Sequence, residues 1–175
     1  TCNGTNLTMG ASTYKILGNT DGFIAKFDAN LQPVSLFGYG GLGTETPTGL
    51  AVDSTGSIIV SGKFSGSALL IGGQTAISLS GPSVQASDEG YLMKIAPNGK
   101  SVQWIVPVLG AGRQSANKIA IDARDGIYLA GQFSSPVVTL GGLSLTNLNT
   151  SGYTAAFIYL LDSSGAPQWG DIISA

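Results

Sequence analysis

Short segments in which apolar and polar residues alternate run through this chain, and the same segments recur. The segment 23–28 (FIAKFD) returns 68 residues later as 91–96 (YLMKIA) and a third time as 157–162 (FIYLLD). The segments 49–53 and 57–64 return in the same way as 118–122 and 126–133. Alternation with a period of two predicts half-buried β-strands, and recurrence at a fixed spacing predicts a repeat architecture.

Turn-forming residues separate these strands and pair them into hairpins. Asp28-Ala29-Asn30 follows the strand expected at 22–28, and Asn98-Gly99 stands in the same place in the second copy. Asp and Asn side chains bond nearby backbone N–H groups, and Asn-Gly is a strong hairpin signal. Each full repeat therefore holds four strands in two hairpins. Longer variable stretches at 65–87 and 134–153 join these hairpins, and we expect them to be loops with an extra hairpin or ribbon at most.

Four-stranded units in series predict an all-β, β-propeller-like array of antiparallel blades. Residues 1–40 would give a partial first blade, made of a loop and an outer hairpin. Residues 45–108 would give a second blade and residues 114–173 a third. About two and a half blades cannot close a ring that has typically 4–8. The incomplete ring predicts a segment of a larger propeller, or a subunit that other copies or partners complete.

Composition supports this fold and narrows the function. Only 10% of the residues are charged and 26 are glycine, which favours short strands and tight turns over helices. The net charge is −2 and the eight basic residues are scattered, so we expect no nucleic-acid partner. No apolar run is long enough to span a bilayer. The chain begins Thr1-Cys2 without methionine, which indicates a processed or excised chain.

The chain contains no histidine and one cysteine, which removes most nucleophilic and metal chemistry. We therefore predict no catalytic residue, no metal site and no cofactor. Asp53 with Gly56, and Asp122 with Gly126, are interpreted as structural turn residues of the repeat. Calcium binding at 122–126 is the alternative, but Arg124 intrudes and the segment lacks enough oxygen donors.

Large aromatic residues and lysines recur at fixed positions of the strands. The aromatic set is predicted to pack between blades and comprises Phe23, Tyr91, Trp104, Phe157 and Trp169. Stacking on sugars is the alternative for the two tryptophans. Lys26 and Lys94 lie within otherwise apolar strands, and we expect them to be rim charges that discourage strand-on-strand aggregation.

Other features suggest an extracellular setting. Acceptor sequons for N-glycosylation occur at Asn3, Asn6 and Asn149, all in expected loops. Cys2 has no partner for an internal disulfide, so it is either a free thiol or half of an intermolecular bridge. Low charge with abundant serine, threonine and glycine also leans toward a secreted or surface protein.

The segments 21–28 and 49–64, together with Asn98-Gly99 and Trp104, resemble the SBBP-type β-propeller repeat. The chain departs from that pattern at three positions: Leu36 replaces the tryptophan, Ala96 the aspartate and Leu160 the lysine. The resemblance covers most of the chain outside residues 1–20 and the variable stretches. It implies a propeller fold in large secreted or surface proteins, and it carries no catalytic residues.

Together these observations predict a non-catalytic structural or adhesive scaffold, extracellular or on the cell surface. Its partners would be further blades of a longer chain, neighbouring subunits or glycans. The alternative is a segment of a propeller-fold lyase or glycosidase whose active site lies elsewhere. That alternative predicts carboxylates and aromatic residues gathered at one mouth of the channel.

Overall fold

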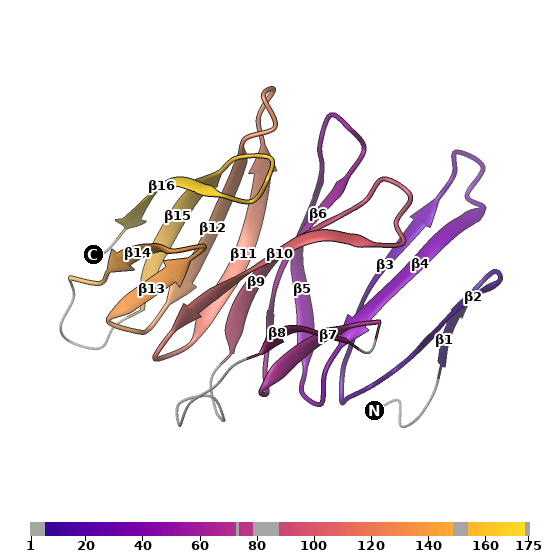
Figure 1. Ribbon diagram of the computed structural model, residues 1–175, viewed down its shortest axis with the longest axis horizontal. Helices are drawn as coiled ribbons and strands as arrows, with labels where there is room; N and C mark the ends of the chain where they lie inside the picture. The colour runs from indigo at the N-terminus through magenta and orange to yellow at the C-terminus, as the bar shows by residue number, and fades with distance from the viewer. Residues whose placement is uncertain (1–5, 73, 79–87, 149–153, 174–175) are drawn as a thin grey trace.

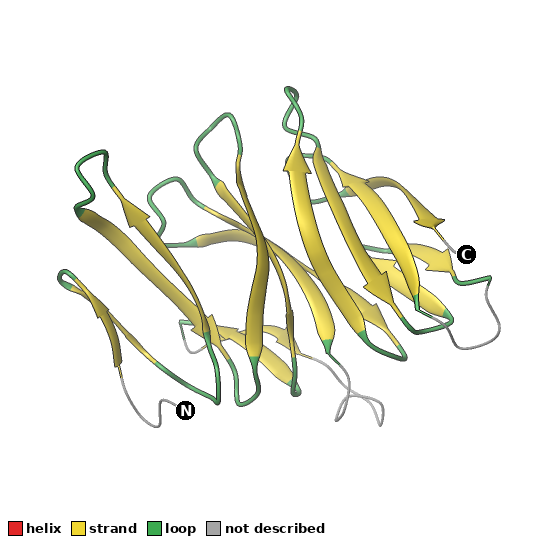
Figure 2. Ribbon diagram, turned by 180° about the vertical axis from the view of Figure 1, so that it is seen from behind, coloured by secondary structure: helices red, strands yellow, loops and turns green. Residues whose placement is uncertain are grey.

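The computed structural model describes residues 6–72, 74–78, 88–148 and 154–173. The chain is all-β, and the described residues contain no helix (Figure 2). None of them forms a helical span that could cross a membrane. The strands are β1 (Asn6–Met9), β2 (Ser12–Lys15), β3 (Gly22–Phe27), β4 (Pro33–Gly40), β5 (Glu45–Val52), β6 (Ile58–Phe64), β7 (Ala68–Ile71), β8 (Gln74–Ser78), β9 (Glu89–Ile95), β10 (Val102–Gly110), β11 (Gln114–Ile121), β12 (Ile127–Phe133), β13 (Val137–Leu140), β14 (Leu143–Thr146), β15 (Ala155–Leu161) and β16 (Pro167–Ile173).

These strands form three antiparallel sheets and one separate hairpin (Figure 1). The first sheet has the order β3-β4-β7-β8, the second β14-β13-β10-β9-β6-β5 and the third β11-β12-β15-β16. The β1–β2 hairpin lies at one end of the row and β16 at the other (Figure 1). Within the described residues the row stays open and does not close into a ring.

The predicted four-strand meanders are present, with β5, β6, β9 and β10 in one sheet and β11, β12, β15 and β16 in the next. The extra hairpin expected in each variable stretch is present, as β7–β8 and as β13–β14. Each of these hairpins pairs with the last strand of the preceding sheet, a partner that the sequence did not indicate. Tyr39 lies opposite Ile71, and Val108 lies opposite Leu140. The boundaries 45–108 and 114–173 therefore need correction, because each unit lends a hairpin to its neighbour.

The expectation for residues 1–40 also needs correction. Within the stretch expected to be a loop, Asn6–Met9 and Ser12–Lys15 pair as β1 and β2. The polar composition of these residues concealed them, because one face of the hairpin is exposed. The hairpin expected after it is present as β3 and β4.

Two hydrophobic cores fill the spaces between the sheets. The core between the first and second sheets contains Tyr39, Val60, Phe64 and Tyr91. The core between the second and third sheets contains Phe133, Phe157 and Tyr159. The members reach the core because period-two alternation places every second side chain on one face. In β15 the pattern is regular, with buried and half-buried residues alternating from Ala155 to Leu161.

The first sheet is only half of the unit seen in the other two. β6 pairs with β9, and β12 pairs with β15, but β3 is an edge strand among the described residues. The outer face of β3 is correspondingly open. Phe23 is 51% exposed, whereas Tyr91 and Phe157, which occupy the same repeat position, are 0% and 1% exposed. An aromatic residue at this position is buried only where a preceding sheet covers it.

Candidate functional site: the inter-sheet network

Aspartates at the strand ends build the turns that place the polar groups of this protein. Asp53 Oδ1 accepts hydrogen bonds from the backbone N–H groups of Thr55 and Ser57, at 2.9 Å each. Asp28, Asp122 and Asp162 accept equivalent bonds from the residues two and four positions later. A carboxylate that satisfies two backbone donors fixes the turn. The four turns also have the same two backbone hydrogen bonds, so they share one backbone shape.

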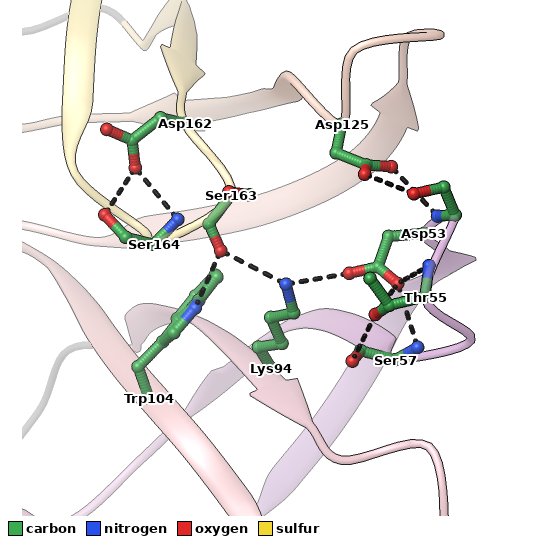
Figure 3. A network of polar contacts seen from close by, with 10 residues as sticks. Asp53, Thr55, Ser57, Lys94, Trp104, Asp125, Asp162, Ser163 and Ser164 are labelled. Atoms are coloured by element: carbon green, nitrogen blue, oxygen red, sulfur yellow. Dashed lines mark hydrogen bonds and ion pairs between the residues drawn. The ribbon is translucent and has the colours of Figure 1, made fainter.

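Lys94 links two of these turns across the space between the second and third sheets (Figure 3). Its Nζ lies 2.7 Å from Asp53 Oδ2 and donates a hydrogen bond of 3.2 Å to the carbonyl oxygen of Ser163. Trp104 Nε1 donates to the same carbonyl at 3.2 Å. The pair is nearly enclosed, since Lys94 is 7% and Asp53 8% exposed. We call Asp53, Lys94, Trp104 and Ser163 the inter-sheet network.

The first sheet repeats this contact. Lys26 occupies the position of Lys94, and its Nζ donates a hydrogen bond of 2.7 Å to the carbonyl oxygen of Pro97. Pro97 and Ser163 occupy equivalent positions in the turns of the second and third sheets. The expectation of edge or rim charges is therefore wrong for Lys94, which is buried between two sheets. Lys26 does lie on an edge strand among the described residues, and it also joins its sheet to the next one. The third repeat has Leu160 at this position.

A second set of contacts links the inner turns. Ser54 donates from its backbone N–H and its Oγ to the two carboxylate oxygens of Asp125, at 2.9 and 2.5 Å. Thr48 Oγ1 donates to the carbonyl oxygen of Ala116. Asp125 holds the left-handed position of its turn, with a φ of 61°, where the preceding repeat has Gly56 with a φ of 81°. Gly126 follows it at the position of Ser57, as the repeat alignment predicts, and the backbone N–H of each donates to the aspartate of its turn.

These hydrogen bonds lower the pKa values of three turn aspartates. Burial acts to raise the pKa of Asp53, but hydrogen bonds from Lys94, Thr55 and Ser57 outweigh it and lower the pKa to about 2. Backbone N–H groups of Gly126 and Arg124 lower the pKa of Asp122. The hydrogen bond from the Ser164 hydroxyl is the largest influence lowering the pKa of Asp162. These carboxylates are stable anions at neutral pH, which suits holding a turn and not general acid catalysis.

A second polar cluster is buried between the first and second sheets. The hydroxyl groups of Tyr39 and Tyr91, both fully buried, share a hydrogen bond of 2.6 Å. Glu45 lies nearby and is 1% exposed. Burial and the charge of Asp21 raise the pKa of the Glu45 carboxyl to about 7, against its ordinary value of 4.5, although the backbone of Gly41 lowers it in part.

A cavity of about 380 Å³ lies between the N-terminal hairpin and β3. Leu7, Tyr14, Asp21 and Phe23 are among its lining residues. Both carboxylate oxygens of Asp21 are engaged: Oδ2 accepts from the Tyr14 hydroxyl at 2.7 Å, and Oδ1 from the Gly18 N–H at 3.1 Å. Burial is the largest cause that raises the pKa of Tyr14, and Asp21 adds to it. This carboxylate orders the chain that enters β3.

The predicted aromatic set divides in the structure. Tyr91 and Phe157 are buried between sheets, and Trp104 reaches the next sheet, where its ring lies against Gly165. Phe23 and Trp169 do not pack between sheets, being 51% and 43% exposed. The reason is the same for both, because in the described residues no sheet precedes the first or follows the third.

The remaining predicted residues are placed as follows. Asn6 is exposed at the start of β1 and pairs with Lys15, so its sequon lies on a strand and not in a loop. Cys2, Asn3 and Asn149 lie outside the described residues. The described residues contain no group of three His, Cys, Asp or Glu side chains that could hold a metal ion. No model of a known protein family matches this chain, and no curated protein matches it at a significant level.

Sequence reasoning missed the role of the lysines, although a signal was present. A charged residue at a fixed position of an otherwise apolar repeat strand must find a partner when a neighbouring sheet covers it. The recurrence of Lys26 and Lys94 therefore indicated an inter-sheet bond. The acceptor could not be read from sequence, because it is a backbone carbonyl.

Proposed function

We propose that this chain is a non-catalytic scaffold of propeller-like repeats that acts outside the cell or on its surface. The observation that carries the proposal is the recurrence of one contact: a lysine of each preceding sheet bonds a turn carbonyl of the next, as Lys26 does with Pro97 and Lys94 with Ser163. In these two contacts the lysine side chains bind the neighbouring sheet, and this structural use supports a scaffold.

Further support comes from the exchanged hairpins and from the sequence resemblance. Hairpins β7–β8 and β13–β14 cross to the preceding sheet, which ties successive units together as in other repeat proteins. The resemblance to the SBBP-type repeat favours blades of a propeller and a secreted or surface location. Structural and adhesive functions suit such a rigid array, whose loops vary between repeats and offer contact surfaces for subunits or glycans.

Two measurements test this proposal. Fractionation of the source cells with an antibody should find the protein in the medium or at the surface, and a cytoplasmic location would contradict it. The purified chain should release no product from a panel of plant, bacterial and animal polysaccharides. Turnover that is lost in Asp21→Asn would overturn the non-catalytic assignment.

The second candidate is a segment of a propeller-fold lyase or glycosidase. The cavity beside β3 favours it, since Tyr14, Phe23 and Asp21 bring aromatic rings and a carboxylate together. The hydrogen bonds of Asp21 weigh against it, because the Tyr14 hydroxyl and two backbone N–H groups already engage both carboxylate oxygens in ordering the chain ahead of β3. The scaffold remains the better supported function.

A further inference from the structure

A polar cleft of about 340 Å³ lies between the second and third sheets, at the strand ends opposite the aspartate turns. Lys63, at the end of β6, and Asp88, just ahead of β9, line it from the second sheet. Arg113, Gln132 and Ser134 are among the residues that line it from the third sheet. Its volume falls in the range of about 300 to 1,000 Å³ that is usual for small-molecule sites.

Backbone hydrogen bonds hold the two sheets together around this cleft. The N–H of Gln114 donates to the carbonyl oxygen of Asp88 at 2.8 Å. Within the third sheet, the N–H of Ser134 donates to the carbonyl oxygen of Arg113, and Ser134 Oγ accepts from the Arg113 N–H, at 3.0 Å each. These bonds involve the main chain of Asp88 and Arg113, so their side chains are left for the cleft.

The preceding repeat makes the same bonds with uncharged residues. Glu45 N–H donates to the carbonyl oxygen of Thr20, and Thr44 and Ser65 bond each other as Arg113 and Ser134 do. Thr20 therefore matches Asp88, and Thr44 matches Arg113. Since threonine serves the fold at both positions, the two charges in the later repeat are not needed to join the sheets.

The charges of the cleft are only partly used within the chain. Lys63 Nζ lies 2.6 Å from Asp88 Oδ2, and the two side chains are 36% and 33% exposed. Arg113 is exposed, and its guanidinium forms no ion pair with a carboxylate of the described residues. Two cations and one anion leave a single positive charge in the cleft.

A buried acceptor in the wall of the cleft also lacks a donor. Gln114 lines the cleft and is 1% exposed, and its Nε2 donates to Ser135 Oγ at 3.0 Å. Its Oε1 accepts no hydrogen bond within the described part of the chain. Buried acceptors without a donor are uncommon in folded proteins, and they point to a polar group that comes from outside the chain.

The chemistry of the cleft selects an acidic and hydroxylated ligand. A guanidinium presents its donors in a planar fork that fits a carboxylate, and one carboxylate balances the single positive charge. The exposed amide of Gln132 and hydroxyl of Ser134 can both donate and accept, as the hydroxyl groups of a sugar do. Phe133 is 1% exposed, so it offers an apolar ligand no open ring face.

We propose that this cleft binds an acidic saccharide, a uronate unit of a polysaccharide, with the carboxylate of the sugar on Arg113. Ring hydroxyl groups bond Gln132 and Ser134, and a further hydroxyl donates to Asp88, which Lys63 holds in place. The proposal rests on the scaffold function and names the class of glycan that the scaffold holds. It also explains why charges occur at 88 and 113, where the preceding repeat has threonine.

Nuclear magnetic resonance titration of the full chain tests the proposal. The probes are the trisaccharide of galacturonate and a trisaccharide that contains glucuronate, added to the ¹⁵N-labelled protein. Backbone signals of Arg113, Gln132 and Ser134 should shift saturably with at least one of them. Maltotriose has hydroxyl groups but no carboxylate, and it should bind at least about tenfold more weakly.

A variant taken from the repeat itself removes the site without removing the fold. Arg113→Thr installs the residue that the preceding repeat has at Thr44, whose backbone bonds are the same, and affinity for the uronate should fall about tenfold or more. Arg124→Thr is the matched control, because Arg124 is an exposed arginine at the opposite end of β11. It should bind like the unaltered chain. Circular dichroism melting of both variants establishes that they are folded.

Several outcomes would overturn the proposal. They are the absence of saturable shifts with either uronate up to about 10 mM, binding that persists in Arg113→Thr, and binding that falls equally in Arg124→Thr. A tripeptide of glutamate that binds as tightly as the uronates would also overturn it, because the cleft would then recognise a carboxylate and no sugar. These failures leave the scaffold function standing. Polysaccharide turnover would instead remove the scaffold function and leave the titration result unchanged.

Discussion

At the scale of the residue, identical repeat positions acquire different roles according to what covers them. Lys94 is enclosed by two sheets and pairs with Asp53, whereas Lys26 is only half-buried and has a carbonyl partner alone. Leu160 has the same place on an outward face. We therefore expect Lys94 to matter more for stability than Lys26, because a buried carboxylate depends on Lys94.

Replacing Lys94 by leucine, the residue of the third repeat, tests this relation. Lys94→Leu should lower the free energy of unfolding by about 3 kcal/mol, because Asp53 would remain buried without its cation. Lys26→Leu is the matched control and should cost about 1 kcal/mol or less, since no buried carboxylate depends on it. Urea denaturation at pH 7 measures both. Equal losses of unfolding free energy in the two variants would show that the Asp53–Lys94 ion pair adds no stability beyond that of the exposed contact.

Glu45 makes stability depend on pH near neutrality. Its pKa is about 7 in the folded chain, above its ordinary value of 4.5, so the folded state holds the proton more tightly than the unfolded state. Stability from this group is fully present below about pH 4.5 and is lost as pH rises through 7. Asp53 acts in the opposite sense, since its stabilisation is present above pH 3.8 and lost as pH falls toward 2.

Glu45→Gln should remove the loss at high pH. Gln114 occupies the same position in the next repeat and bonds Ser135 at 3.0 Å, which shows that this position accepts an amide. The variant should gain about 1 kcal/mol at pH 8 and little at pH 5. Thermal melting of both proteins between pH 5 and 8 measures the difference. A variant whose melting temperature follows that of the unaltered chain at every pH would contradict the assignment.

At the scale of the element, the aspartate turns keep the same hydrogen bonds in each repeat. The four aspartate turns share their bonds although their other residues differ. Their left-handed position is filled by Leu31, Gly56, Asp125 and Gly165. Leucine is the costly choice, because its Cβ crowds the carbonyl oxygen in this conformation.

Leu31→Gly should therefore stabilise the chain. Leu31 has a φ of 60° and is 79% exposed, so glycine relieves backbone strain and removes little packing. We expect a gain of about 0.5 to 1 kcal/mol by urea denaturation, after the entropy that glycine adds to the unfolded chain. Asp125→Gly is the control and should not gain, because it also removes both hydrogen bonds to Ser54. A loss of stability in Leu31→Gly would argue against strain at this turn.

At the scale of the whole molecule, the chain is a row of sheets whose first member is half built. The hairpin that pairs with β9 in the second sheet, β5–β6, has no counterpart beside β3 in the described residues. Repeat proteins gain stability from each neighbour contact that is added. We therefore expect a strand added beside β3 to stabilise the array.

A chain that carries a second copy of residues 45–67 directly ahead of Asn6 tests this expectation. Asn6 matches Ala68, so the added strand would reach β3 in the register that β6 has with β9, with its glycine opposite Phe23 as Gly62 is opposite Tyr91. The melting temperature should rise by about 5 °C, as expected for a gain of about 2 kcal/mol. The same extension with Val60→Asp in the added copy should give no rise. Equal melting of both extended chains would contradict the half-built sheet.

The sequence by itself determined the local structure of this protein. Period-two alternation at residues 57–64 and 127–133 and the Asp and Asn-Gly turns specified strands and hairpins, because these signals act between residues that are close along the chain. The equivalence of 23–28, 91–96 and 157–162 specified the number of repeats.

Only the tertiary structure decided which edges and faces meet. It moved hairpins 68–78 and 137–146 to the preceding sheets, directed Lys26 and Lys94 to backbone carbonyls, and left Phe23 exposed where Tyr91 is buried. The hydrophobic pattern of a strand predicts that one face is buried. Every strand also has two edges whose backbone groups need hydrogen-bond partners. The pattern does not predict which distant strand satisfies them, because backbone hydrogen bonds carry no sequence code.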